Sequence, residues 1–396
     1  MKKLVLSSAI ALGLSTVASS AMAEDIKIGV FLGLTGPIES LVAEMAPAAE
    51  QAIAEVSESG KFLDGSTVTA VRADTTCVDA AAATAAIERL ITADKVAGVV
   101  GGDCSGVTTA ALTNVALPNG MVMISPSATS PALSTVEDNG LFFRTAPSDA
   151  RQGVVMTEII MDKGYKEVAL TYTNNDYGKG LADAFQTAFE ENGGTVTISA
   201  AHEDGKADYA AEVGALASAG GELLVVAGYL DQGGKGIIQG SLDTGAFDTF
   251  VLPDGMVGEA LPKAIGSDLD GSFGQAPGTD SAGAGKLVEM VGDKYDATSP
   301  FAAESYDAAA LILLAMQSAG STDPAEYKDK VMDVANAPGE EILPGELAKG
   351  LQILADGGEI NYVGASNVEL IGAGESAGNY REIEIKDGAL STVGYR

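Results

Sequence analysis

The stretch that decides the fold is residues 97–131, AGVVGGDCSGVTTAALTNVALPNGMVMISPSATSP. Two short apolar runs, 97–100 and 121–124, predict buried strands. Each run ends in a small polar turn: Ser105 follows the first and opens a helical pattern, and the hydroxyl-rich loop 125–131 follows the second. In a parallel α/β sheet, both turns lie in the crevice at the carboxyl ends of the strands. Hydroxyls and free backbone N–H groups there suit a carboxylate or another anion.

A second interpretation of the same turns is purely structural. Ser105 and Thr129 are residue types that cap helices, and capping alone would explain a hydroxyl at each turn. The stretch by itself does not decide between capping and ligand binding, so the rest of the chain has to.

Strand-like and helix-like patterns alternate on both sides of this stretch, which predicts an α/β fold of two doubly wound parallel-sheet lobes. The segments 141–147 and 270–281 look like crossings between the lobes, and the second of them is loop-like in composition. The helices after 281 have no strands of their own, so we expect them to pack on the first sheet. The elements expected outside the deciding stretch are strand 26–34, helix 39–58, strand 67–73, helix 79–92, helix 149–163, strand 167–172, helix 178–191, strand 195–200, helix 207–218, strand 222–227, helix 232–243, strand 249–253, helices 281–295, 302–319, 324–335 and 345–355, and short strands from 361 onward.

Residues 1–23 have the pattern of a secretory signal peptide. Lys2 and Lys3 precede an apolar run, and Ala21-Met22-Ala23 fits a small-residue cleavage site. We therefore expect an exported, soluble protein, located in the periplasm where the cell has two membranes. The formal charge of −32 over 396 residues repels nucleic acid and anionic membranes, so neither is an expected partner.

Cys77 and Cys104 are the only cysteines, and in an oxidising compartment such an isolated pair is expected to form a disulfide. Two cysteines and the lone His202 make a poor metal-ligand set, and we expect His202 in an exposed loop. A catalytic triad would need that histidine, and no G-x-S-x-G motif surrounds a serine. The sequence thus predicts no catalytic residues, no metal and no cofactor.

Three polar residues follow successive strands of the second lobe. Tyr177, Tyr229 and Asp254 come just after the strands expected at 167–172, 222–227 and 249–253. They should face the same crevice as Ser105 and Thr129. Hydroxyls, phenols and one carboxylate together suit a zwitterion, with Asp254 on its ammonium group.

A set of short motifs runs along the chain: E-D-I-K-I-G at 24–29, T-G-P at 35–37, the pair Cys77/Cys104 followed by Ser105, S-P-S-A-T-S-P at 125–131, F-R-T at 143–145, N-D-Y-G at 175–178 and Y-x-G-A-S at 362–366. In these motifs the sequence resembles the type I periplasmic binding proteins for branched-chain amino acids, the leucine/isoleucine/valine-binding group. The resemblance implies two lobes joined by three crossings: an N-terminal lobe of 24–145 plus 277–361 and a C-terminal lobe of 146–276 plus 362–396.

The resemblance also implies which residues hold the backbone of an amino-acid ligand. By position these are Ser105, Ser127, Ala128, Thr129, Tyr177, Tyr229 and Asp254. Two departures concern the ligand. Leu41 stands where the family often has an aromatic residue over the ligand side chain, and Asp254 replaces the usual Glu. We therefore expect a less covered, aliphatic side-chain pocket around Leu41.

The sequence-based hypothesis is a monomeric solute-binding protein that captures a small amino acid by lobe closure and delivers it to an inner-membrane ABC permease. One alternative is a sensory module that passes a ligand signal to a membrane receptor. Another is the same fold binding an amide or a carboxylate that has no amino group. An enzyme is not expected.

Overall fold

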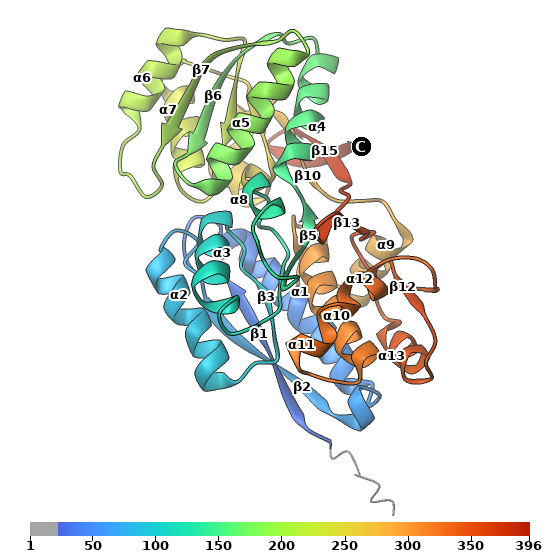
Figure 1. Ribbon diagram of the computed structural model, residues 1–396. Coiled ribbons are helices and arrows are strands. Elements are labelled where there is room, and N and C mark those ends of the chain that lie inside the picture. The colour runs from blue at the N-terminus through green and yellow to red at the C-terminus, as the bar shows by residue number, and fades with distance from the viewer. Residues whose placement is uncertain (1–22) are drawn as a thin grey trace, which may run out of the picture.

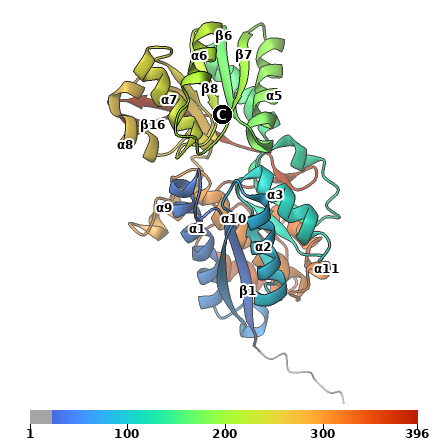
Figure 2. The same ribbon diagram turned by 90° about the vertical axis from the view of Figure 1, so that its left-hand side faces the viewer.

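A computed structural model describes residues 23–396 of the chain. Residues 1–22, which hold nearly all of the expected signal peptide, lie outside this range. Two lobes lie one above the other, each built on its own seven-stranded sheet (Figures 1 and 2). The prediction of two doubly wound α/β lobes is confirmed.

The first sheet has the strand order β13-β14-β5-β4-β3-β1-β2. Strands β1 to β5 are parallel to their neighbours, as the alternating pattern predicts. The strands are β1 (Asp25–Leu32), β2 (Thr67–Asp74), β3 (Gly98–Gly101), β4 (Met123–Ser125), β5 (Phe142–Pro147), β13 (Leu370–Ile371) and β14 (Glu375–Ser376). Its first helices are α1 (Glu39–Glu58), α2 (Ala80–Arg89) and α3 (Ser105–Ala111).

The helices after residue 281 complete the first lobe, as expected. Helix α10 (Ala302–Ala319) packs against α1 and against strands β3, β4 and β5. Nearly all its residues are buried because it lies between that sheet and other helices. The other elements of this part are α9 (Ala282–Val291), α11 (Pro324–Tyr327), α12 (Lys330–Ala335), α13 (Leu347–Ala355), and the small parallel pair β11 (Glu340–Ile342) and β12 (Ile360–Tyr362).

The second sheet has the order β16-β15-β10-β9-β8-β6-β7, and its first five strands in the sequence are parallel. Its strands are β6 (Glu167–Thr173), β7 (Thr195–His202), β8 (Leu223–Ala227), β9 (Phe250–Leu252), β10 (Phe273–Pro277), β15 (Tyr380–Lys386) and β16 (Ala389–Tyr395). Its helices are α4 (Asp149–Asp162), α5 (Asp176–Glu191), α6 (Ala210–Ala219), α7 (Gly233–Thr244) and α8 (Ala260–Ile265).

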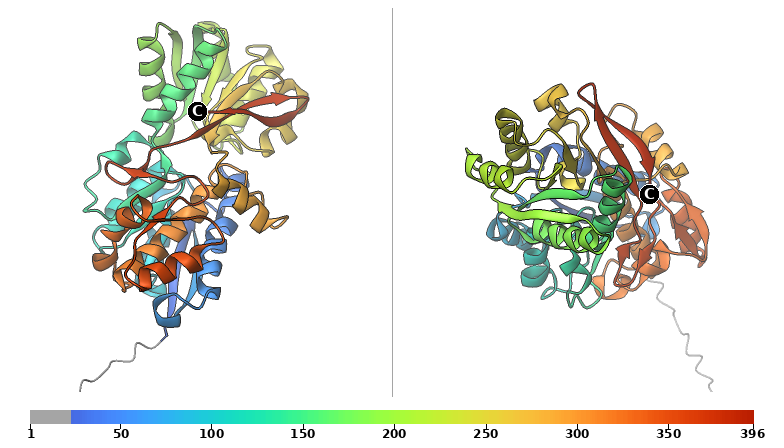
Figure 3. Two further views of the ribbon diagram at one scale, coloured as in Figure 1. Left: turned by 90° about the vertical axis from the view of Figure 1, so that its right-hand side faces the viewer. Right: turned by 90° about the horizontal axis from the view of Figure 1, so that it is seen from above.

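The chain passes between the two sheets three times, and the details correct three expectations. Segment 141–147 contains a full strand of the first sheet, β5, and the loop-like segment 270–281 contains β10. Strands β13 and β14 pair in the first sheet, so residues 370–376 lie with the N-terminal lobe and not with the C-terminal one. The third crossing therefore comes just before β15, the first strand of the C-terminal hairpin (Figure 3).

The glycine content of β10 has a packing cause. A Cβ atom on Gly274 would lie 1.8 Å from the carbonyl oxygen of Leu252 in β9, so only glycine permits this approach. A residue type that is typical of turns thus permits a close strand pairing here. For this reason the composition of the segment predicted a loop.

His202 is not in an exposed loop as expected. It ends β7 with 1% of its surface exposed, and its Nδ1 lies 2.9 Å from the Thr171 hydroxyl. The turn-like residues that follow it belong to the next loop, and the strand simply runs two residues further than its pattern indicated.

Candidate functional site

The candidate site is a cavity between the lobes, at the carboxyl ends of both sheets. Six of the residues expected from the sequence line it: Leu41, Ser105, Ser127, Tyr177, Tyr229 and Asp254. The enclosed space is only about 20 Å³, roughly the room for one water molecule. The lobes have therefore closed on each other in this structure.

Asp231 of the second lobe forms hydrogen bonds to the first lobe. Its backbone N–H donates to the carbonyl of Pro37 (3.1 Å), and its carboxylate accepts the backbone N–H of Ser40 (2.9 Å). Pro37 belongs to the T-G-P turn of the first lobe, and Asp231 follows β8 of the second. These two hydrogen bonds join the lobes directly.

Side-chain hydrogen bonds to its backbone hold the hydroxyl-rich loop after β4 in place. The Ser105 hydroxyl accepts the backbone N–H of Ser130 (3.1 Å), and the Ser125 hydroxyl accepts that of Ala128 (2.9 Å). Arg144 on β5 donates to the carbonyls of Ala128 (3.0 Å) and Ser130 (2.9 Å). Each of these bonds fixes the loop beside Ser105.

Arg144 supports the loop at 125–131, and the sequence analysis did not select it as a site residue. Its side chain is only 1% exposed and pairs with Glu375 of β14 at 2.5 Å. A guanidinium is one of the few cations that tolerates burial, because its five donors can all find acceptors. Its F-R-T motif was the available signal, but the sequence did not say what the arginine touches.

Neither hydroxyl singled out at the start caps a helix. Ser105 is the first residue of α3 and bonds to the neighbouring loop, while the Thr129 hydroxyl has no hydrogen-bond partner within residues 23–396. The caps nearby come instead from Ser130 and Ser148. The structural alternative for Ser105 and Thr129 is therefore wrong.

The second lobe contributes two stacked phenols and a buried carboxylate. The rings of Tyr177 and Tyr229 stack with centroids 5.2 Å apart. The Tyr177 hydroxyl donates to Asp254 Oδ1 (2.6 Å), which also accepts the backbone N–H of Gly255 (2.8 Å). Asp254 is 1% exposed, so the carboxylate faces the cavity without contact with bulk water.

Burial is the main cause of the raised pKa values of Asp254 and Tyr177 in the second lobe. Loss of water raises the pKa of the Asp254 carboxyl, and the hydrogen bonds from Tyr177 and Gly255 lower it in part. The pKa of the Tyr177 hydroxyl is raised by burial first and then by the charge of Asp254. Tyr177 therefore stays protonated and remains a donor.

Five further residues line the cavity, and the sequence analysis assigned none of them to ligand binding: Ile38, Asp103, Cys104, Gly255 and Phe301. Phe301 matters most, because its ring supplies aromatic cover that the expectation drawn from Leu41 did not include. It precedes α10, far along the chain from the strand ends that guided the prediction. Ala128 and Thr129 belong to the same loop as Ser127 but do not line the cavity.

Asp103 is a carboxylate already in use. Its two oxygens accept the backbone N–H of Gly33 (2.6 Å) and the hydroxyl of Thr75 (2.7 Å). The predicted disulfide beside it, Cys77–Cys104, is formed. Together they tie the turns after β1, β2 and β3 into one platform.

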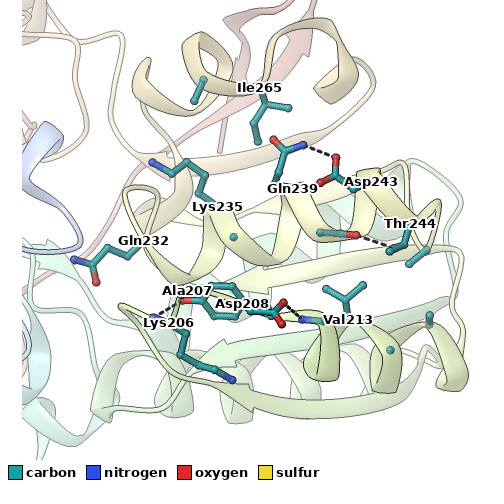
Figure 4. A pocket seen from close by; sticks show the side chains of 18 of the residues that line it. Lys206, Ala207, Asp208, Val213, Gln232, Lys235, Gln239, Asp243, Thr244 and Ile265 are labelled. Carbon is teal, nitrogen blue, oxygen red and sulfur yellow. Dashed lines mark hydrogen bonds between the residues drawn. The ribbon is translucent and has the colours of Figure 1, made fainter.

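A larger hollow lies on the outer face of the second lobe, between α6 and α7 (Figure 4), with a volume of about 1030 Å³. Several of its polar groups are paired with each other: Gln239 donates to Asp243 (2.8 Å), and Asp208 accepts the N–H of Ala210 (2.9 Å). The cleft between the lobes, in contrast, is lined by residues of both lobes and holds the buried carboxylate of Asp254. We therefore take the cleft as the functional site.

Two searches of the described residues concern membranes and metals. No helix within residues 23–396 is long and apolar enough to cross a membrane. Across the same range, no cluster of three or more His, Cys, Asp or Glu side chains could hold a metal ion.

Comparison with known sequences gives consistent matches over most of the chain. A family model described as periplasmic binding protein matches residues 25–339. The Leu/Ile/Val-binding protein homolog 1 of Brucella abortus is 29% identical over 357 residues, which cover 86% of this chain and 93% of the relative. A chemotactic signal transduction system substrate-binding protein of Halobacterium salinarum is 27% identical over 389 residues, covering 93% and 89%.

Solved structures share the fold. A leucine binding protein of Thermotoga maritima has a TM-score of 0.78 at 22% identity, covering 93% of this chain and 98% of its own. An ABC transporter solute binding protein of R. palustris, in complex with benzoate, has a TM-score of 0.75 at 18% identity, covering 94% and 96%.

Proposed function

Because the chain belongs to the periplasmic binding protein family, we propose that it captures a small aliphatic amino acid between its two lobes. The hydroxyls of Ser105 and Ser127 and the loop they flank bind the ligand carboxylate. Asp254 binds the ammonium group from the opposite lobe. The captured ligand is then delivered to an inner-membrane ABC permease.

The observation that carries this proposal is the buried Asp254 carboxylate facing the hydroxyl-rich loop across a closed cleft. A ligand enclosed there loses its water, so each of its charges needs a partner in the protein. The two lobes offer partners of the two kinds that a zwitterion requires. The names of the relatives from Brucella abortus and Thermotoga maritima support an aliphatic amino acid.

Two alternatives differ from this proposal in ligand or in partner. The benzoate complex of the R. palustris protein shows that the same fold can hold an acid without an amino group. Such a ligand would leave the Asp254 charge unanswered or repelled, which favours an amino acid. The Halobacterium salinarum relative is named for chemotactic signalling, and a sensory role would share the capture step and differ only in the protein that reads it.

The test is the substitution Asp254→Asn. The asparagine oxygen still accepts from Tyr177 and Gly255, so the shape remains while the charge is removed. We expect amino-acid affinity to fall by about 2–5 kcal/mol, roughly 30-fold or more, in calorimetric titration.

Ser105→Ala serves as the matched comparison, with an expected loss of about 1–3 kcal/mol because it removes one neutral hydrogen bond. Circular dichroism checks that both variants fold. An Asp254→Asn variant that binds its amino acid as tightly as the parent would mean that no ammonium group sits there.

A further inference from the structure

Three buried polar side chains beside Asp254 have no hydrogen-bond partner within residues 23–396. They are Thr129, Asp149 and Gln152, and the unpartnered atoms include both carboxylate oxygens of Asp149. Each of the three is at most 1% exposed. Leaving a buried carboxylate without any donor is strongly unfavourable, so its retention calls for an explanation.

Asp149 is bonded to the loop that flanks the proposed ligand site. It is the first residue of α4, and its backbone N–H donates to the Thr129 carbonyl at 2.8 Å. Thr129 in turn lies two residues after Ser127, which lines the cavity. Gln152, one turn further along α4, lies close enough to Asp254 to lower the pKa of that carboxyl.

The groups facing Asp149 come from four other elements. Burial raises the pKa of Asp149 most and the charge of Asp254 raises it further, whereas the Thr129 hydroxyl and Arg144 on β5 lower it. Tyr177 on α5 and Tyr380 on β15 also face it, since its charge raises the pKa of both phenols. Two acids therefore lie near each other in a dry environment.

Arg144 does not answer the charge of Asp149 by direct pairing. Its guanidinium donates to the carbonyls of Ala128 and Ser130, to Ser134 and to Glu375. The usual structural use of an acid at this helix position is also filled, because Ser148 caps α4 through the N–H of Ala150. Neither neighbour accounts for the two free oxygens.

We propose that Asp149 is a second recognition residue, whose carboxylate shares the ligand's ammonium group with Asp254 and the Thr129 hydroxyl. This inference rests on the proposed function. An ammonium group carries three N–H donors that point in different directions, and one carboxylate cannot accept all three. A site with two carboxylates and a hydroxyl therefore selects α-amino acids against the same carbon skeleton without the amino group.

The experiment compares L-leucine with 4-methylpentanoate, which lacks only the amino group, by calorimetric titration of the full mature chain. We expect the parent to bind L-leucine at least about 100-fold more tightly. Asp149→Asn should weaken L-leucine binding by about 10- to 100-fold and change 4-methylpentanoate binding by less than about threefold.

Asp176→Asn is the matched control. Asp176 is the first residue of α5, as Asp149 is of α4, but its side chain is exposed. The substitution Asp176→Asn removes the same favourable negative charge at a helix N-terminus. It should leave both affinities unchanged. If Asp149→Asn does not fold, Thr129→Val tests the same site, with an expected loss of about 3- to 30-fold for L-leucine alone.

Two results would overturn the inference, and they separate it from the proposed function. Unchanged L-leucine affinity in Asp149→Asn, or an equal loss for both ligands, removes Asp149 from recognition and leaves the proposed function standing. A parent protein that binds 4-methylpentanoate as tightly as L-leucine, or that binds no aliphatic amino acid of alanine to leucine size, overturns both.

Discussion

At the scale of single residues, the main feature of the cleft is the buried carboxylate of Asp254. Asp254 keeps its carboxylate away from bulk water, and its bonds to Tyr177 and Gly255 satisfy only one of its two oxygens. The remaining acceptor capacity suits the ammonium group of the proposed ligand. A second buried carboxylate, that of Asp149, lies near enough for the charge of Asp254 to raise its pKa.

His202 makes a residue-scale prediction that is independent of any ligand. Burial lowers its pKa to about 4, so the unfolded chain, with an ordinary imidazole pKa near about 6.5, binds more protons between these values. Its stabilising contribution is therefore complete above the unfolded pKa and is lost as the pH falls towards the folded one. We expect a loss of about 2 kcal/mol between about pH 7.5 and pH 5.

His202 is the only histidine of the sequence, so its pKa can be measured without assigning the resonance to one of several histidines. The imidazole proton resonance in a nuclear magnetic resonance titration should have its midpoint near 4. Urea unfolding of His202→Gln should show a shallower pH dependence than the parent, because the other titrating groups are common to both. A midpoint at the ordinary value for histidine would contradict the buried placement.

The sequence predicted the site residues that follow parallel strands and missed those placed by the crossings. Tyr177, Tyr229 and Asp254 could be found because the ends of parallel strands share one edge of a sheet. Phe301, which lines the cavity, and Asp149, which we propose as a recognition residue, lie before a late helix and just beyond a crossing, where strand order gives no information. Their positions depend on how the two lobes meet.

At the scale of elements, the regular alternation of strand and helix patterns made most of the fold predictable. A close approach of two strands made one element hard to predict, because it requires residues that are typical of turns. Helix α1 has the bounds that its apolar spacing predicts, Glu39–Glu58. Strand β10 was missed because the residues that let it approach β9, above all Gly274, are the residues typical of turns. The helix expected at 324–335 is divided into α11 and α12.

The disulfide is the element-scale feature most open to test. It closes a sequence separation of 27 residues, joining the turn after β2 to the residue before α3. Removing it in Cys77→Ala/Cys104→Ala should lower the free energy of unfolding by about 3–4 kcal/mol in the chain-entropy account. Urea unfolding of this variant and of the parent measures the difference.

Thiol alkylation before and after reduction provides the control, read as intact mass. The parent from its native source should take up alkyl groups only after reduction. A parent that is alkylated twice without reductant, or a variant as stable as the parent, would contradict the disulfide's role.

At the scale of the whole molecule, capture depends on movement of one lobe against the other. The enclosed space of about 20 Å³ is too small to admit a ligand, so the lobes must separate for entry and close again around it. The bonds of Asp231 to Pro37 and Ser40 join the two lobes, so separation of the lobes would break them. A ligand that contacts both lobes shifts the equilibrium towards this arrangement.

The central claim is that this closed cleft holds an aliphatic amino acid. Calorimetric titration of the protein, unfolded and refolded to remove any ligand, against the twenty amino acids and benzoate tests it most directly. The account predicts that an aliphatic amino acid of alanine to leucine size binds most tightly, and that benzoate does not compete with it. Tighter binding of benzoate than of every amino acid, or of phenylalanine or tryptophan than of every aliphatic one, would contradict it.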